Sequence, residues 1–307
     1  MITYVTGSLF ESPAQVLVNT VNTVGVMGKG VAYQFKRLFP EMFEQYRALC
    51  ESGQLRVGKL WLYKTPNKWI LNFPTKIHWR NPSRLEYIEA GLRAFVYSYT
   101  TMGVHSIAFP PLGCGNGQLD FATQVQPIME KYLRNLPIEV FIHPDRDDPF
   151  EPEHTVPEEM REWLRSEPAS LPFAEVWDDL VDVVTRRSEF STQTGTSTFA
   201  VRAVADPPHL LIETAGGNRV TVPYEALQAF WQQIRTHGYT TRKIAPDMTR
   251  QLSYLIPVFA ELHYVRLVNL SDSYEKLTQN PSIGLQIRPN ASSNSESRVQ
   301  LSLFELV

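Results

Sequence analysis

The sequence twice places a glycine-rich loop between a short apolar strand and a helix, and this repeated arrangement constrains the fold most strongly. The first loop, residues 25–30, follows an apolar run at residues 14–19. The second, residues 113–117, follows an apolar run at residues 106–111. Strands that alternate with helices predict a three-layer α/β/α domain. Loops that end such strands meet at one edge of the sheet, so we expect the two loops to grip one ligand between them.

Apolar spacing predicts the remaining elements of this domain, which we place at residues 1–148. A serine, Ser83, is expected to cap a long amphipathic helix at residues 85–101, and Gly103 is expected to end it. Further helices are predicted at residues 31–39, from Pro40 to about residue 49, and at 121–133, and further strands at 1–5, 60–63, 69–73 and 140–142.

Composition changes after residue 145, where the sequence becomes acidic and rich in proline. We predict a linker at residues 149–172, with one short helical stretch near 160–164, and a smaller C-terminal α+β domain at residues 173–307. In that domain we expect strands at 199–204, 210–213 and 219–222, helices at 224–235 and 252–264, a low-complexity stretch at 290–298 and an apolar end, 301–307, that packs on something.

Length and composition narrow the class of protein. The chain has 307 residues, which is more than a single hydrophobic core usually supports, so we expect two domains. The net charge of −3 gives no support for non-specific nucleic-acid binding. No apolar run reaches the roughly 18 residues that span a bilayer, and the N-terminus lacks the pattern of a signal peptide. With only Cys50 and Cys114, far apart, we expect a cytoplasmic protein without disulfides. The seven histidines lack ligand spacing, so no metal site is expected.

The first glycine loop is suited to a phosphate, since amides at a helix N-terminus attract anions and glycines let the backbone approach closely. Asn19 and Asn22 could place their amides on ribose hydroxyls. The order of residues around Lys29 is not that of a Walker loop, and the glycine spacing is not that of a dinucleotide fingerprint. A simpler interpretation stays open, in which the glycines only turn the chain and the asparagines cap it.

Two residues, Cys114 and Lys76, are candidates for a role in catalysis. Cys114, in the second loop, could be a nucleophile. The sequence shows no base evidently placed to deprotonate its thiol, however, which favours a structural role or a place in the pocket wall. Lys76, in the cluster at residues 72–84, could attack a sugar carbon or act as a cation. In the same cluster His78 could transfer protons, Trp79 could stack on a base, and Arg80 and Arg84 could bind phosphates. The alternative is a solvated loop anchored by the tryptophan.

Three segments taken together resemble the macrodomain superfamily: residues 17–35 (LVNTVNTVGVMGKGVAYQF), 71–80 (LNFPTKIHWR) and 110–119 (PPLGCGNGQL). More narrowly they resemble the DarG-type antitoxins, DNA ADP-ribosyl glycohydrolases that remove the ADP-ribose which a DarT-type toxin attaches to thymidine in single-stranded DNA. The resemblance spans residues 1–143 and implies a mixed sheet between helices.

The resemblance also implies roles for individual residues, and no cofactor. It makes Lys76 the catalytic residue, Asn22 the ribose-side asparagine, and residues 26–30 and 113–117 the phosphate loops. The ADP-ribose-binding residues implied are Ser8, Leu9, Asn19, Asn22, Val26, Met27, Gly28, Lys29, Gly30, Val31, Pro111, Leu112, Gly113, Cys114, Gly115, Asn116 and Gly117, and the DNA- or base-binding residues are Thr75, His78, Trp79 and Arg80.

The sequence departs from the family at two places. Gly7-Ser8 stands where the family has Gly-Asp, whose aspartate reads the adenine amine, so backbone groups or another side chain must do this here. Asn116 and Gly117 stand where relatives that act on protein carboxylates have an aspartate, so the proton donor is not identified.

Three functions follow as hypotheses. The first is removal of ADP-ribose from modified single-stranded DNA, as the antitoxin to a DarT-like toxin. The second is hydrolysis of protein-, RNA- or acetyl-linked ADP-ribose, and the third is a binding module without catalysis. We expect the C-terminal domain, which shows no catalytic cluster, to bind the toxin or its DNA, with a purely stabilising role as the alternative.

Overall fold

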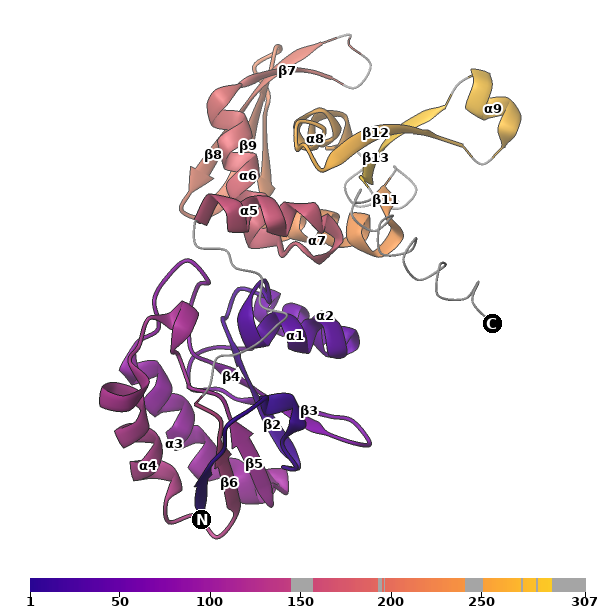
Figure 1. Ribbon diagram of the computed structural model, residues 1–307. Coiled ribbons are helices and arrows are strands. Elements are labelled where there is room, and N and C mark those ends of the chain that lie inside the picture. Colours follow the sequence, from indigo (N-terminus) through magenta and orange to yellow (C-terminus); the bar gives the residue numbers. More distant parts are fainter. Residues whose placement is uncertain are drawn as a thin grey trace, which may run out of the picture. The chain divides into compact units, whose positions relative to one another are not determined.

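The computed structural model describes residues 1–144, 157–192, 195, 197–240, 251–271, 273–279 and 281–288. The chain divides into two compact units, Met1–Arg161 and Glu162–Val307 (Figure 1). This division falls inside the predicted linker, and the predicted domain limits at 148 and 173 stay predictions. The low-complexity stretch and the apolar end lie outside the described residues. Within those residues, no helix is both long enough and apolar enough to cross a membrane.

The first unit is built on a six-stranded mixed sheet in the order β1-β6-β5-β2-β4-β3, in which only β3 runs antiparallel to its neighbour. Its strands are β1 (Ile2–Tyr4), β2 (Val16–Val21), β3 (Trp61–Lys64), β4 (Trp69–Pro74), β5 (Ser106–Phe109) and β6 (Glu139–Ile142), and its helices are α1 (Gly30–Leu38), α2 (Pro40–Glu51), α3 (Leu85–Met102) and α4 (Gln126–Leu133), with short turns η1 (Leu9–Glu11), η2 (Gly115–Gly117) and η3 (Phe121–Val125).

Two separate cores cover the two faces of this sheet, because successive side chains of a strand point to opposite faces. In β2, Val16 and Val18 pack with α3 and α4, while Leu17 packs with α1 and α2. Both cores consist of buried, mainly aliphatic and aromatic side chains, and Phe95 in α3 and Phe35 in α1 are fully buried. The three-layer α/β/α fold and the mixed sheet are therefore confirmed.

The start of α3 differs from the prediction. Its N-cap is Arg84, with no side-chain cap bond, and not Ser83. The backbone N–H of Ser83 instead donates to the carbonyl of Gly117 at 2.9 Å, and this bond ties the second glycine loop to the start of α3. At the other end of the helix, Gly103 has a φ of +78° and ends α3 as predicted.

The second unit holds two antiparallel sheets, in the orders β10-β9-β8-β7 and β11-β13-β12. This confirms a further C-terminal region of strands and helices. The sequence did not predict α6, β7, β11, β12, α9 or β13, and the predicted helix at 252–264 ends at Phe259. Helix α5 (Pro157–Ser166) spans the division between the units. The elements after it are η4 (Pro168–Ser170), α6 (Phe173–Arg186), β7 (Glu189–Ser191), β8 (Thr198–Ala205), β9 (Pro208–Thr214), β10 (Arg219–Pro223), α7 (Tyr224–His237), β11 (Tyr239–Thr240), α8 (Leu252–Phe259), β12 (Val265–Leu270), α9 (Tyr274–Gln279) and β13 (Ser282–Ile287).

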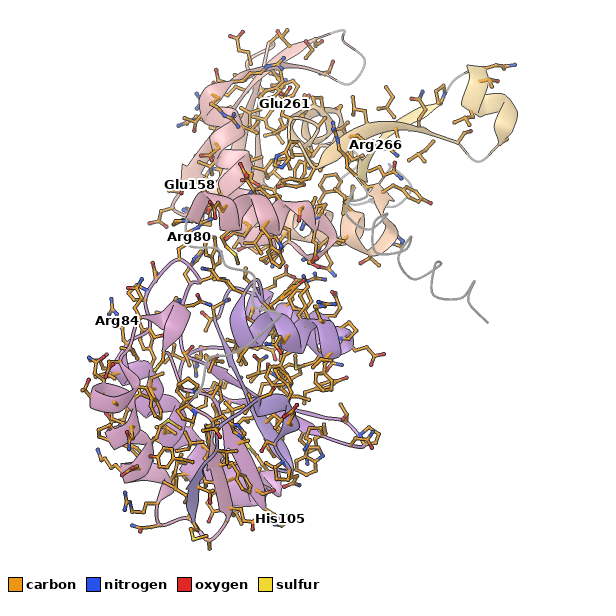
Figure 2. All side chains as sticks on the ribbon, in the orientation of Figure 1. Arg80, Arg84, His105, Glu158, Glu261 and Arg266 are labelled. Atoms are coloured by element: carbon orange, nitrogen blue, oxygen red, sulfur yellow. The ribbon has the colours of Figure 1, made fainter. Side chains whose placement is uncertain are left out.

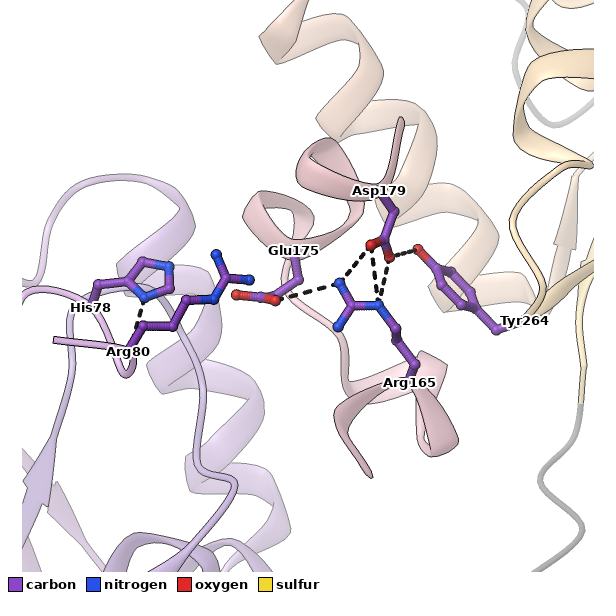
Figure 3. A network of polar contacts seen from close by, with 6 residues as sticks. All are labelled: His78, Arg80, Arg165, Glu175, Asp179 and Tyr264. Atoms are coloured by element: carbon purple, nitrogen blue, oxygen red, sulfur yellow. Dashed lines mark hydrogen bonds and ion pairs between the residues drawn. The ribbon is translucent and has the colours of Figure 1, made fainter. Parts of the chain in front are cut away.

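A buried polar network joins α5, α6 and the residue before β12 (Figure 3). The Arg165 guanidinium lies 2.6 Å from a carboxylate oxygen of Asp179 and 3.6 Å from one of Glu175. The Tyr264 hydroxyl donates to Asp179 at 2.8 Å, and burial raises the pKa of this tyrosine well above its usual value. Buried charges need such partners, so the network fixes these three segments to one another.

Candidate functional site

The carboxyl ends of the parallel strands of the first unit open into one cleft, which both glycine loops and the cluster after β4 line. Most of the residues expected at the site lie in this lining: Ser8, Leu9, Asn22, Val26, Gly28, Lys29, Gly30, Val31, Thr75, Lys76, Trp79, Arg80, Pro111, Gly113, Cys114, Gly115, Asn116 and Gly117. The topology thus brings together segments that are up to about a hundred residues apart in the chain.

Four expected residues lie outside that lining. Met27 and Leu112 are buried in the cores, and Asn19 is fully buried, with its side-chain amide donating to Asn72 Oδ1 at 2.9 Å. His78 is partly exposed, and its Nδ1 accepts a hydrogen bond from the backbone of Arg80. Ligand contact by these four residues stays a prediction.

The first glycine loop is braced by Asn22. The side-chain amide of Asn22 donates to the Val26 carbonyl at 2.6 Å, and its Oδ1 accepts from the backbone N–H groups of Val24 and Val26. The buried Tyr46 hydroxyl donates to the Asn22 carbonyl at 2.8 Å. The loop is therefore held in one conformation before a ligand arrives, which reduces the entropy lost on binding.

The start of α1 lines the same cleft through Gly30, Val31 and Ala32. The helix begins at Gly30, whose φ of +56° favours glycine, and its N-cap Lys29 makes no side-chain cap bond to the first turn. The first N–H groups of a helix have no partner within the helix and carry the positive end of its dipole. Because Lys29, Lys76 and Arg80 also line the cleft and its described lining includes no aspartate or glutamate, the site favours an anion.

The second glycine loop is packed tightly against the start of α3. A Cβ on Gly117 would lie 2.4 Å from Ser83 Oγ and 3.0 Å from Ser83 Cβ, so no larger residue fits there without a shift. Gly113 and Gly115 have positive φ values of 69° and 66°. The Cys114 thiol is partly buried and lies 3.6 Å from the Leu112 carbonyl, an arrangement that suits a wall residue.

Lys76 lies where the cluster after β4 meets the second glycine loop. The segment is anchored by the Thr75 N–H, which donates to Val21 O at 2.9 Å. The Lys76 amine donates to the backbone oxygens of Trp79, at 3.4 Å, and of Asn116. Burial, and secondly the charge of Lys29, lower the pKa of Lys76 from 10.5 to about 8. With this pKa, about a tenth of the amine is unprotonated at pH 7, and the unprotonated form can act as a nucleophile.

Beside the lysine, Trp79 and Arg80 form an aromatic and cationic surface. The Arg80 guanidinium lies over the Trp79 ring, 4.8 Å from its centroid, and the Arg80 side chain is exposed (Figure 2). The rings of His78 and Trp79 are 5.7 Å apart. Such a surface can stack on an unpaired base and contact a phosphate.

The lining also contains five polar residues that were not among the predicted site residues: Thr20, Asn81, Ser83, Gln118 and His143. Ser83 and His143 differ from the other three. Each carries a buried atom, Oγ and Nε2 respectively, that has no hydrogen-bond partner in the described structure. A signal for His143 was present, since it follows the predicted strand at 140–142 directly. For a metal, the described residues contain no group of three or more His, Cys, Asp or Glu placed to hold one.

Comparison with known proteins gives the relationships of the first unit. Residues 18–128 match the family model described as Macro domain. The DNA ADP-ribosyl glycohydrolase of Thermus aquaticus is 46% identical over 153 residues, which cover 48% of this chain and 42% of that protein. A DNA ADP-ribosyl transferase–DNA ADP-ribosyl glycohydrolase fusion protein of Thermosipho africanus is 39% identical over 161 residues, 46% of this chain and 41% of that protein.

Among solved structures, the macrodomain of Thermus aquaticus DarG is 47% identical and is covered over 99% of its length by 47% of this chain, with a TM-score of 0.45. The present chain matches only about two fifths of the length of these curated glycohydrolases. Each of these three matches covers slightly less than half of this chain. Through residues 18–128 and the sequence around them, the chain belongs to the macrodomain family.

Proposed function

We propose that the first unit hydrolyses the bond between ADP-ribose and thymidine in single-stranded DNA. The observation that carries the proposal is the Lys76 amine, which has a lowered pKa and lies at the junction of the second glycine loop and the Trp79–Arg80 surface. A module that only binds ADP-ribose needs no reactive amine there. Relatives at 45% and 46% identity that carry the name DNA ADP-ribosyl glycohydrolase support the choice of substrate.

The order of strands gives the ADP-ribose one orientation in the cleft. Lys76 follows β4, and the loops before α1 and after β5 lie at the neighbouring strands β2 and β5. The amides of these loops suit the central diphosphate. We place the distal ribose, with its C1″ atom, at Lys76 and the adenosine toward β6 and β1, three strand spacings or about 14 Å away.

The chemistry at C1″ follows from this placement. The unprotonated Lys76 amine attacks C1″ or stabilises charge there while the bond to the thymine base breaks. The thymine keeps the electron pair of the broken bond and takes a proton. Water then adds its hydroxyl group to C1″ and, where the amine has attacked, breaks the bond between C1″ and Lys76 and frees the lysine. The products are ADP-ribose and intact thymidine. The Trp79–Arg80 surface holds the strand beside the cleft through a stacked base and a phosphate contact.

The second unit, in this proposal, binds the toxin that makes the substrate. The Thermosipho fusion protein joins a DNA ADP-ribosyl transferase to a DNA ADP-ribosyl glycohydrolase in one chain, which supports a DarT-like enzyme as the partner of an antitoxin. We assign residues 1–148 to the macrodomain, 149–172 to a linker and 173–307 to partner binding in the cytoplasm.

A substrate comparison tests the function. The full chain is incubated with a thymidine-ADP-ribosylated single-stranded oligonucleotide and, separately, with a carboxylate-linked ADP-ribosylated protein, and released ADP-ribose is measured by chromatography. We expect rapid release from the oligonucleotide and at least about tenfold slower release from the protein. Two results would contradict the proposal. Faster release from the protein than from the oligonucleotide would assign the cleft to protein adducts. No release from either substrate would leave the cleft with ligand binding alone.

A further inference from the structure

His143 is held rigidly at the end of the cleft opposite to Lys76. It directly follows β6, three strands away from β4 in the sheet, and only 3% of its surface is exposed. Its backbone N–H donates to Phe109 O at 2.9 Å, and its ring Nδ1 lies 3.1 Å from Gly7 O. These two bonds anchor the residue to the end of β5 and to the loop after β1.

The bond to Gly7 determines what the other ring nitrogen can do. A carbonyl oxygen only accepts hydrogen bonds, so the hydrogen between these two atoms belongs to Nδ1. In the neutral imidazole Nε2 then carries a lone pair and acts as an acceptor. This Nε2 is buried and finds no partner among the described residues, although His143 lines the cleft. Because an unpaired buried acceptor costs free energy, a ligand that donates a hydrogen bond is favoured here.

The neighbouring side chains leave this role to His143. The Ser8 hydroxyl accepts from the backbone N–H of Phe10 at 3.3 Å and is thereby directed to its own loop. Leu9 and Phe10 add apolar surface to the same part of the lining. An apolar wall with one buried acceptor fits a flat heterocycle that carries an amino group.

We propose that His143 Nε2 accepts a hydrogen bond from the exocyclic amine of adenine and makes the cleft selective for an adenine over a 6-oxopurine nucleotide. The inference rests on the occupancy by ADP-ribose proposed above, which puts the base at this end. Hypoxanthine carries a carbonyl oxygen where adenine carries the amine, so two acceptors would face each other and the 6-oxopurine would be rejected.

Titration calorimetry of the full chain with ADP-ribose and with inosine diphosphate ribose tests this inference. We expect the wild-type protein to bind ADP-ribose at least about tenfold more tightly than the inosine analogue. His143→Asn keeps a donor near Gly7 O but removes the acceptor at the position of Nε2, so it should bind both ligands within about twofold of each other. His143→Gln, which can place an amide oxygen near that position, should restore part of the preference.

His105 provides the matched control, since its side chain is exposed (Figure 2). It precedes β5 and therefore lies at the amino-terminal end of the strands, whereas the cleft lies at their carboxyl ends. His105→Asn should keep the wild-type preference. Three results would overturn the base selection. The first is equal affinity of the wild-type protein for the two ligands, and the second is a wild-type preference for ADP-ribose in His143→Asn. The third is an equal decrease of both affinities in a folded His143→Asn variant. Absence of ADP-ribose binding by the wild-type protein, in contrast, overturns the proposed function itself, so the two failures are distinguishable.

Discussion

The amine of Lys76 donates a hydrogen bond to the backbone oxygen of Asn116, forty residues further along the chain. This bond joins the segment after β4 to the glycine loop after β5. It places a partly buried amine directly against the loop that is proposed to hold the distal ribose and the diphosphate. The position of the amine therefore depends on the conformation of that loop.

Gly117→Ala should disturb the site through this dependence. The new Cβ would lie 3.0 Å from Ser83 Cβ whatever rotamer the serine hydroxyl adopts, so the loop must move away from α3. We expect turnover of modified DNA to fall about tenfold, which corresponds to roughly 1.4 kcal/mol. Gly216→Ala is the control, since its Cβ would meet nothing closer than 4.0 Å. Equal turnover in the two variants would show that the packing at Gly117 does not matter.

The pH dependence of turnover should report the pKa of Lys76. If the unprotonated amine reacts, the rate rises with pH and levels off above the pKa of about 8. Lys29 contributes to the lowering, so Lys29→Gln should raise the pKa of Lys76 and move the midpoint of the normalised profile to higher pH. Single-turnover rates measured across the pH range check this, and a midpoint that moves to lower pH contradicts the assignment.

Lys76 should also reduce the stability of the fold. Its pKa is about 8 in the folded protein against an ordinary 10.5, so the folded state disfavours the charged amine. The free energy of unfolding therefore rises as pH increases from about 8 to 10.5, and at neutral pH the cost is fully present. Lys76→Met should raise the unfolding free energy at neutral pH by about 1 kcal/mol, less than the shift alone implies because solvent screens part of the side chain. Urea unfolding at neutral pH measures it, and a destabilised variant would argue against a penalty for the buried charge.

In the second unit, stability should depend on the buried network around Arg165. Arg165→Leu removes the cation that faces Asp179 at 2.6 Å and Glu175 at 3.6 Å, and loss of one partner of a buried pair costs about 3–5 kcal/mol. We expect a lower unfolding midpoint for the second unit in calorimetry, without loss of hydrolysis by the first. Arg187→Leu, at an exposed pair with Glu261, should change stability by less than about 1 kcal/mol. Similar losses in the two variants would contradict a structural role for the network.

The cleft could be predicted from the sequence because its loops end strands of a predicted parallel arrangement. Once residues 14–19 and 106–111 are strands of one sheet, the loops after them must meet, and Lys76 follows a third strand at the same edge. Local patterns carry this information, since a strand, a glycine loop and a helix are adjacent in the chain.

Long-range contacts could not be predicted in this way. The bond between His143 and Gly7 spans 136 residues and depends on β1 pairing with β6. Ser83 has the residue type and position of a cap, yet its backbone binds Gly117, and Arg84 becomes the N-cap. In the second unit, by contrast, α6 begins directly after Pro172, where the predicted linker ends. Its buried apolar residues follow a helical spacing, so this helix could have been predicted from the sequence.

The role of Lys76 in the removal of ADP-ribose from DNA can be tested by comparing two lysine variants. Lys76→Ala and Lys59→Ala, the latter at an exposed lysine outside the cleft lining, are each assayed for ADP-ribose binding and for release from thymidine-ADP-ribosylated single-stranded DNA. We expect both variants to bind ADP-ribose, Lys59→Ala to keep wild-type release, and Lys76→Ala to release ADP-ribose at least about a hundredfold more slowly. Wild-type release by a folded Lys76→Ala variant would show that Lys76 is not the catalytic residue.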